Sequence, residues 1–156
     1  MVEVRPFLWI PERAEEALAF YTEVFAESRL VEVVHADMGS GERDLVVGRL
    51  RLPGLEVQLF NGAGDVAFTH AFSLMIVCDT QAEIDHHWDA LLAGGEPVAC
   101  GWLRDRFGLS WQVTPRRLLE FLQSDDLEAS ARARDAMLAM VKLDLPALEA
   151  AFAGDA

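Results

Sequence analysis

The sequence predicts an α+β domain in which a similar run of strands and one helix occurs twice, followed by a helical segment. Three observations support this prediction: short apolar runs bounded by turn residues, two segments with apolar residues at helical spacing, and a similar element order in both halves. A length of 156 residues fits one domain. We expect a single domain over residues 1–156, made of modules 1–66 and 67–115 and a C-terminal helical extension 116–156.

The first module is expected to have the order strand, helix, strand, strand, strand. Residues 4–10 are apolar and aromatic, which is typical of a strand, and Pro11 ends it. Residues 13–25 alternate apolar side chains with glutamates at helical spacing. Glycines and polar residues indicate a loop at 37–42. The remaining strands are expected at 28–36, 44–52 and 55–60, the last two joined by the turn Pro53-Gly54.

The second module repeats the beginning of this order. Residues 71–78 are an apolar run typical of a strand, and a helix with Asp79 or Thr80 as its cap follows. Gly94-Gly95 ends that helix. Two strands are expected next, at 96–103 and 109–114, which gives the order strand, helix, strand, strand. The extension is expected to be helical from Leu118 and over 129–141 and 144–152.

Composition excludes several classes of protein. A net charge of −13 argues against a nucleic-acid partner, because phosphates require a basic surface. No apolar run approaches the roughly 20 residues that span a bilayer, and the N-terminus lacks the pattern of a signal peptide. Cys78 and Cys100 are too few for a disulfide scaffold, so we expect reduced thiols and a cytoplasmic protein without a membrane partner.

Several segments resemble a known superfamily. The order of elements, the helix ending at residues 19–21 (AFY) and the segment 88–95 (WDALLAGG) resemble the vicinal oxygen chelate superfamily of glyoxalases, bleomycin-resistance proteins and dioxygenases. Residues 100–112 (CGWLRDRFGLSWQ), with 137–152, resemble more narrowly the PhnB-like family, often labelled 3-demethylubiquinone-9 3-methyltransferase. The resemblance implies paired βαβββ-type modules that form a curved mixed sheet with a concave pocket, and it also implies a homodimer.

The family label does not by itself predict methyl transfer. A common methyltransferase needs a glycine-rich turn between its first strand and the following helix, in a parallel α/β sheet. The glycine-rich stretches 39–41 and 62–64 lie between predicted strands instead. We therefore do not expect a methyl donor.

The resemblance also implies where a divalent metal would bind in the superfamily's enzymes. Its ligands come from the first strand of each half, commonly His, and the last strand of each half, commonly Glu. The matching positions here are Arg5 or Phe7, Gln58, Phe72 and Gln112. Arginine stays protonated and an amide oxygen is a weak ligand for a transition metal. Glu56 and His70 are the only replacements nearby, each displaced by two residues, so we expect no metal and no cofactor.

Strand alternation predicts which side chains face the pocket. In the strand 55–60, residues 56, 58 and 60 would face the pocket, while 57 and 59 would pack on the helix. In the strand 109–114, residues 110, 112 and 114 would face the pocket, while 111 and 113 would pack on the helix. Residues 72 and 74 are expected on the pocket face of their strand. The candidate ligand-binding residues are Trp9, Glu56, Gln58, Phe60, His70, Phe72, Ser110 and Gln112.

These residues support three hypotheses about function. The first is a small-molecule-binding protein, independent of metal, that sequesters an aromatic or cationic ligand in a mostly apolar pocket with a few polar anchors. The second is a metal-dependent glyoxalase-like lyase or isomerase, or a dioxygenase, that uses Glu56 and His70. The third is a structural or interaction dimer with a vestigial pocket. The sequence identifies no catalytic residue and leaves open whether the protein is an enzyme.

Overall fold

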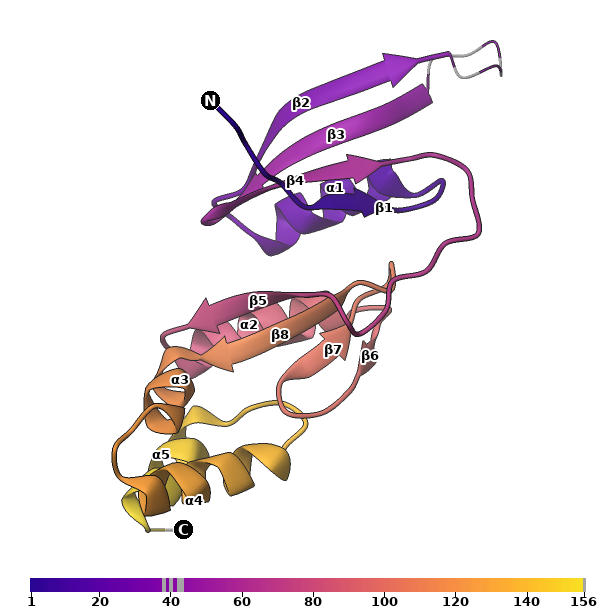
Figure 1. Ribbon diagram of the computed structural model, residues 1–156. Helices are drawn as coiled ribbons and strands as arrows, with labels where there is room; N and C mark the ends of the chain where they lie inside the picture. The colour runs from indigo at the N-terminus through magenta and orange to yellow at the C-terminus, as the bar shows by residue number, and fades with distance from the viewer. Residues whose placement is uncertain (38, 40, 42–43, 156) are drawn as a thin grey trace. The chain divides into compact units, whose positions relative to one another are not determined.

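The computed structural model describes residues 1–37, 39, 41 and 44–155, apart from the side chains of residues 45 and 46. The chain forms two compact units, Met1–Ala67 and Phe68–Ala156 (Figure 1). Each unit has a four-stranded mixed sheet with a helix packed on it. The predicted α+β class with paired βαβββ modules and C-terminal helices is confirmed, although the strands form two sheets rather than one. Part of the expected loop 37–42 lies outside the described residues.

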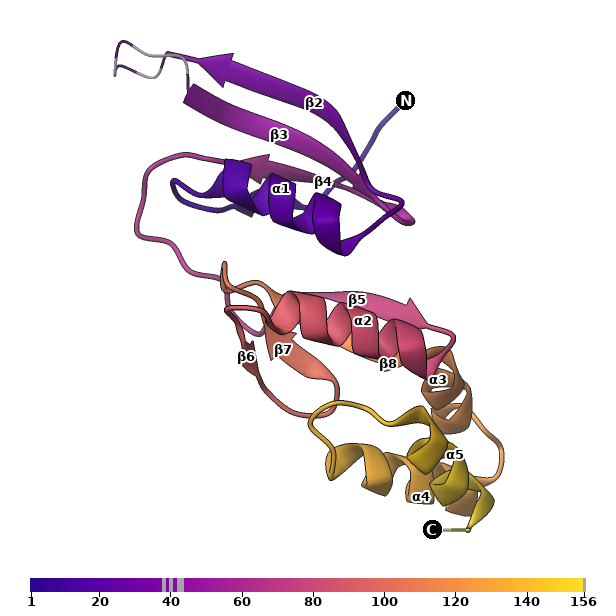
Figure 2. The same ribbon diagram turned by 180° about the vertical axis from the view of Figure 1, so that it is seen from behind.

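The first unit follows the expected element order. Its sheet has the order β1-β4-β3-β2, in which β1 runs parallel to β4 and the other pairs are antiparallel. The helix α1 lies across one face of this sheet (Figure 2). The elements are β1 (Phe7–Trp9), α1 (Ala14–Val24), β2 (Arg29–Ala36), β3 (Asp44–Leu52) and β4 (Leu55–Phe60).

The core of the first unit lies between α1 and the sheet. Buried apolar residues of α1 face the buried side chains of β1, β3 and β4, among them Leu8, Leu50 and Leu59. Gly48 allows the helix to approach, because a Cβ atom there would lie 2.3 Å from Cδ1 of Leu18. Burial therefore assigns one face of β1, β3 and β4 to the helix and leaves the other face open.

The second unit contains one more strand than the sequence predicted. The expected strand 96–103 is in fact two short strands separated by a turn, in which Cys100 and Gly101 have φ of 54° and 81°. The second module is therefore also βαβββ, with the sheet order β5-β8-β7-β6. Of the two residues expected to cap the helix, Asp79 and Thr80, the structure has Thr80 at the cap, where it forms a capping box with Glu83. The elements are β5 (Ser73–Cys78), α2 (Gln81–Leu92), β6 (Glu96–Pro97), β7 (Trp102–Arg104) and β8 (Ser110–Pro115).

Three helices follow β8 in the same unit: α3 (Arg116–Leu122), α4 (Leu127–Leu138) and α5 (Leu145–Ala153). They share a core that includes Leu143 and Leu148. The side-chain amide of Gln81 donates to the carbonyl of Leu143 at 3.3 Å, and its oxygen accepts from the backbone N–H of Leu145 at 2.7 Å. The extension is thus attached to α2. None of the described helices is long and apolar enough to cross a membrane.

A buried carboxylate organises the connection between β7 and β8. Asp105 is only 3% exposed. One oxygen accepts the backbone N–H groups of Phe107 and Leu109 at 2.8 and 3.1 Å, and the other accepts the indole N–H of Trp111 at 2.8 Å. Because these bonds hold both the turn and a core tryptophan, Asp105 has a structural role in this loop.

Candidate functional site

The sheet face of the first unit opposite α1, hereafter the open face, is organised in three rows across β3, β4 and β1. Strand register places the side chains of each row next to one another. Arg5 extends the third row because it lies two residues before Phe7. The rows are Val47, Phe60 and Trp9; Arg49, Gln58 and Phe7; and Arg51, Glu56 and Arg5. The predicted assignment of Glu56, Gln58 and Phe60 to one face is confirmed by burial of Val57 and Leu59 on the other.

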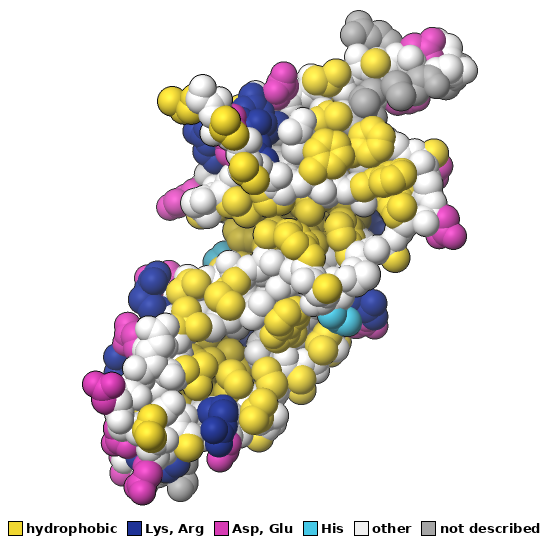
Figure 3. Space-filling model, in the orientation of Figure 1, with side chains coloured by type: hydrophobic (Ala, Val, Ile, Leu, Met, Phe, Trp, Pro, Cys, Tyr) yellow, Lys and Arg dark blue, Asp and Glu magenta, His cyan; other side chains and the backbone are white. Residues whose placement is uncertain are grey.

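Three aromatic rings form a continuous surface at one end of the open face. The ring centroids of Phe7 and Phe60 are 5.9 Å apart, and those of Trp9 and Phe60 are 5.6 Å apart. Phe7 is 58% exposed and Trp9 37%, so the rings are accessible. The indole N–H of Trp9 donates to the carbonyl of Gly62 at 2.6 Å, which fixes the orientation of that ring. Hydrophobic side chains gather visibly over β1 and β4 (Figure 3).

Gln58 lies beside this aromatic surface. It is half-buried, and register places it directly between Phe7 on β1 and Arg49 on β3. Within the described part of the chain, its side-chain amide has no hydrogen-bond partner. An amide offers two N–H donors and a carbonyl acceptor, so Gln58 can form directional bonds to a molecule lying on the rings.

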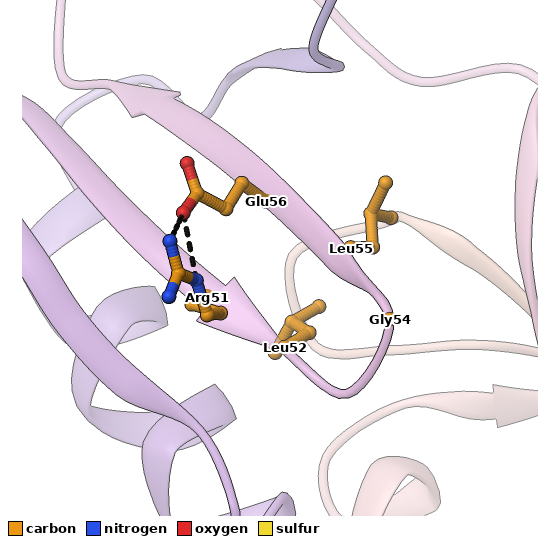
Figure 4. A pocket seen from close by; sticks show the side chains of 5 residues that line it. All are labelled: Arg51, Leu52, Gly54, Leu55 and Glu56. Carbon is orange, nitrogen blue, oxygen red and sulfur yellow. Dashed lines mark hydrogen bonds and ion pairs between the residues drawn. The ribbon is translucent and has the colours of Figure 1, made fainter.

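Charged side chains occupy the other end of the open face. The Glu56 carboxylate accepts from Arg51 Nε at 2.7 Å (Figure 4). It also lies 3.3 and 3.5 Å from nitrogens of Arg5 and Arg49. The hydrogen bond from Arg51 lowers the pKa of Glu56, and the charges of Arg49 and Arg5 act in the same direction while burial opposes them. Glu56 is therefore an ionised partner for three guanidinium groups, which sequence reasoning did not predict.

Two hollows border Glu56 at the turn between β3 and β4. One, of about 290 Å³, is lined by residues 51–56 without Pro53 (Figure 4). The other, of about 360 Å³, is lined by residues 3–5 and 54–56. A larger groove of about 570 Å³ lies between α1 and β2, where Leu18, Ala19, Leu30 and Val33 line it. The sequence did not indicate this groove, because it forms where the edge strand passes the helix.

The second unit brings together three other predicted residues. His70 Nδ1 lies 3.1 Å from the hydroxyl of the buried Ser110, and the Gln112 amide donates to the hydroxyl of Ser73 at 2.9 Å. Unlike Gln58, Gln112 is therefore engaged within its own sheet. Both faces of β8 are largely buried, but register agrees with the predicted orientation: Gln112 lies beside the exposed Met75, and Trp111 lies beside the buried Leu103.

The predicted orientation of β5 was wrong. Leu74 pairs with the buried Trp111, so it belongs to the face that packs on α2, and Met75 is the neighbour of Gln112 on the opposite face. Phe72 precedes the strand and donates its backbone N–H to the carbonyl of Thr69 at 3.3 Å. It is 43% exposed but is not part of the alternation that the prediction assumed.

Neither cysteine forms a disulfide. Burial raises the pKa of the Cys78 thiol to about 11, and the charges of Glu83 and Asp79 act in the same direction. The Cys78 thiol is therefore protonated at neutral pH and unsuited to nucleophilic chemistry.

The donor groups present do not fit the metal site of the superfamily's enzymes. In the part of the chain that the structure describes, no three His, Cys, Asp or Glu side chains are grouped as metal ligands. Glu56 is engaged by three arginines and His70 by Ser110. The positions that register aligns with Gln58 and Gln112 hold Phe7 and Met75, neither of which supplies a hard nitrogen or oxygen donor. We therefore derive no chemistry through a metal.

Comparison with known structures identifies the fold. The chain is similar to the PhnB protein from Bacillus cereus, with 30% identity, a TM-score of 0.67, and coverage of 73% of this chain and 99% of that chain. Protein PA1353 from Pseudomonas aeruginosa matches with 17% identity, a TM-score of 0.64, and coverage of 74% and 98%. The fosfomycin resistance protein FosX from Mesorhizobium loti matches with 16% identity, a TM-score of 0.54, and coverage of 80% and 100%.

The repeated βαβββ units and these structural neighbours define a protein of the vicinal oxygen chelate superfamily. Within that superfamily, the family model described as 3-demethylubiquinone-9 3-methyltransferase matches residues 2–114, and the chain belongs to this family. The helices α3, α4 and α5 lie beyond the matched region. A search among curated proteins gave no match.

Proposed function

We propose that the protein binds a small planar aromatic molecule on the open face of its first unit, without a metal. The observation that supports this most strongly is the partly exposed cluster of Phe7, Trp9 and Phe60. Beside it lies Gln58, whose amide has no hydrogen-bond partner among the described residues. Rings of this kind bind a flat molecule by stacking, and a single amide fixes its orientation. The fold alone says nothing about a reaction.

The charges on the open face favour an aromatic ligand over a cationic one. Arg5, Arg49 and Arg51 lie near the rings, and each is paired with an acid of this face. A cation would therefore have to compete with these arginines for the carboxylates. The net charge of −13 acts over longer distances and is screened by salt. We therefore carry forward the aromatic part of the sequence-based hypothesis.

Fluorescence quenching tests this proposal directly. 4-Nitrobenzamide is a neutral planar molecule that quenches tryptophan emission. Of the four tryptophans, Trp88 and Trp111 are buried, whereas Trp9 is exposed on the proposed site. We expect saturable quenching in the wild-type protein, loss of the saturable component in Trp9→Phe, and about tenfold weaker binding in Phe60→Ala because one stacking surface is removed.

Trp102→Phe is the matched control, because Trp102 is a half-buried tryptophan on β7 of the other unit. The saturable quenching should persist in this variant and after treatment with a chelator. Quenching that rises only linearly up to the solubility limit of the amide would contradict the proposal. Saturable quenching that disappears with the chelator would support the metal-dependent alternative instead.

We also propose that the protein acts as a homodimer in the cytoplasm. Exposed apolar side chains away from the proposed binding surface, such as Met75 and Leu138, support an interface, since a monomer leaves them in water. Sedimentation velocity of the purified chain would distinguish a dimer from a monomer.

A further inference from the structure

We propose that the ligand of the open face carries a carboxylate, which binds to Arg49 while its aromatic ring lies on Phe7 and Phe60. This inference rests on the proposed function and adds the chemical class of the ligand. It follows from the position of Arg49 in the three rows and from the way its charge is balanced.

The first step is the position of the guanidinium group. Arg49 shares the middle row with Gln58 and Phe7, and Phe60 lies in the next row, roughly 7 Å away along the strand. A ring on Phe60 with a carboxylate attached to it spans a distance of this order once the hydrogen bond of about 3 Å from the guanidinium to the carboxylate is included. Arg49 and Gln58 would then bind the carboxylate together, one by charge and the other by its N–H donors.

The second step is that Arg49 has unused hydrogen-bonding capacity. One terminal nitrogen lies 3.1 Å from Glu32 and the other 3.5 Å from Glu56. Its Nε atom is buried and, among the described residues, has no hydrogen-bond partner. The Arg49 side chain is 23% exposed, so its rim remains accessible from the open face. Because Nε is buried, a ligand would bind the terminal nitrogens, whose contacts of 3.1 and 3.5 Å with Glu32 and Glu56 are longer than a strong charge-assisted hydrogen bond.

The third step is the unequal exposure of the acids around the three arginines. The Glu56 side chain is only 17% exposed and stays among the arginines, whereas those of Glu3 and Glu32 are 59% and 55% exposed. Exposed ion pairs contribute little to stability, so an incoming carboxylate can displace Glu32 from Arg49 at small cost. Glu32 thus holds the place of the ligand's carboxylate when no ligand is bound.

Three probes with the same ring separate this inference from the proposed function. 4-Nitrobenzoate is an anion, 4-nitrobenzamide is neutral, and 4-nitrobenzylamine is a cation at neutral pH. We expect the benzoate to bind about tenfold more tightly than the amide, because a charge-assisted bond to arginine replaces a neutral one. The cation should bind most weakly of the three.

Substitutions then test whether Arg49 causes the preference for the benzoate over the amide. Arg49→Gln should abolish the preference for the benzoate but retain binding of the amide, which also shows that the variant is folded. Glu32→Gln should raise the affinity for the benzoate by about threefold, since it removes the competing acid. Arg13→Gln is the matched control, because Arg13 lies at the start of α1 and pairs with Glu16.

The outcomes are distinguishable. Equal affinities for the benzoate and the amide, or a tighter cation, would overturn the inference and leave aromatic binding intact. A preference for the benzoate that persists in Arg49→Gln would also overturn it, because another group would then bind the carboxylate. Failure of all three probes to bind would overturn the proposed function together with the inference.

Discussion

Replacement of Asp105 by alanine is expected to lower the free energy of unfolding of the second unit by roughly 3 kcal/mol. The side chain is 3% exposed and accepts three hydrogen bonds, from two backbone N–H groups and the Trp111 indole. Alanine removes these acceptors, and the loss of hydrogen bonds to a carboxylate inside the protein is costly. Urea unfolding followed by tryptophan fluorescence measures the effect.

Two further substitutions show whether the loss comes from the hydrogen bonds. Asp105→Asn keeps one carbonyl oxygen but turns an NH2 group toward a donor, so its loss should be smaller than that of alanine. Asp125→Ala removes an exposed acid of the same unit and should change stability by less than about 0.5 kcal/mol. Equal stabilities of Asp105→Ala and Asp125→Ala would refute the structural role of Asp105.

Leu143→Ala is expected to cost about 3 kcal/mol, because the side chain is 1% exposed at the junction between the helical extension and the sheet. A Cβ atom placed on Gly101 would lie 2.9 Å from Cδ1 of Leu143, which shows how closely the two segments pack. Loss of three carbon atoms here leaves a cavity that a turn fixed by backbone hydrogen bonds cannot fill. Thermal or urea unfolding of the purified variant provides the measurement.

Leu127→Ala is the corresponding control, because Leu127 is 79% exposed at the start of α4. Its substitution should change stability by less than about 0.5 kcal/mol. If Leu143→Ala proved as mild as Leu127→Ala, the extension would be only loosely attached. A large loss from Leu143→Ala alone would show that the extension and the second module unfold as one body.

The sequence was most informative where periodicity and turn chemistry agree. The hairpin at 44–52 and 55–60 was predicted with its observed bounds. Pro53-Gly54 marks where the first strand ends and the second begins. The strand expected at 96–103 was wrong because its interruption depends on Cys100 in the left-handed region, which few residues other than glycine adopt. The sequence offered no turn signal there beyond the single Gly101.

The orientation of β5 was not predicted correctly because both faces of the strand are apolar after its first residue, Ser73. Met75 and Val77 are 47% and 36% exposed, yet they are as hydrophobic as Leu74 on the helix side. Alternation shows that side chains point to two faces in turn, but a single serine at the strand end is a weak indication of which face is exposed. The neighbouring strand β8 has polar residues at every second position, and its orientation was predicted correctly.

The candidate site was only partly predictable. Alternation within single strands predicted the shared face of Glu56, Gln58 and Phe60. Arg49 and Arg51 were overlooked because they belong to another strand, β3. The two-residue turn at Pro53-Gly54 contained the missing signal, since it fixes the register that places Arg51 opposite Glu56 and Arg49 opposite Gln58. The groove between α1 and β2 could not be predicted, because it depends on how the helix packs beside the edge strand, which no local sequence pattern determines.

Mapping of backbone amide chemical shifts during titration with 4-nitrobenzamide is the most direct test of binding at the open face. We expect the largest shifts in β1 and β4, around Phe7, Trp9 and Gln58, and little change in α1 or β8. Shifts confined to residues that line the groove between α1 and β2, or to the sheet of the second unit, would contradict the proposed site.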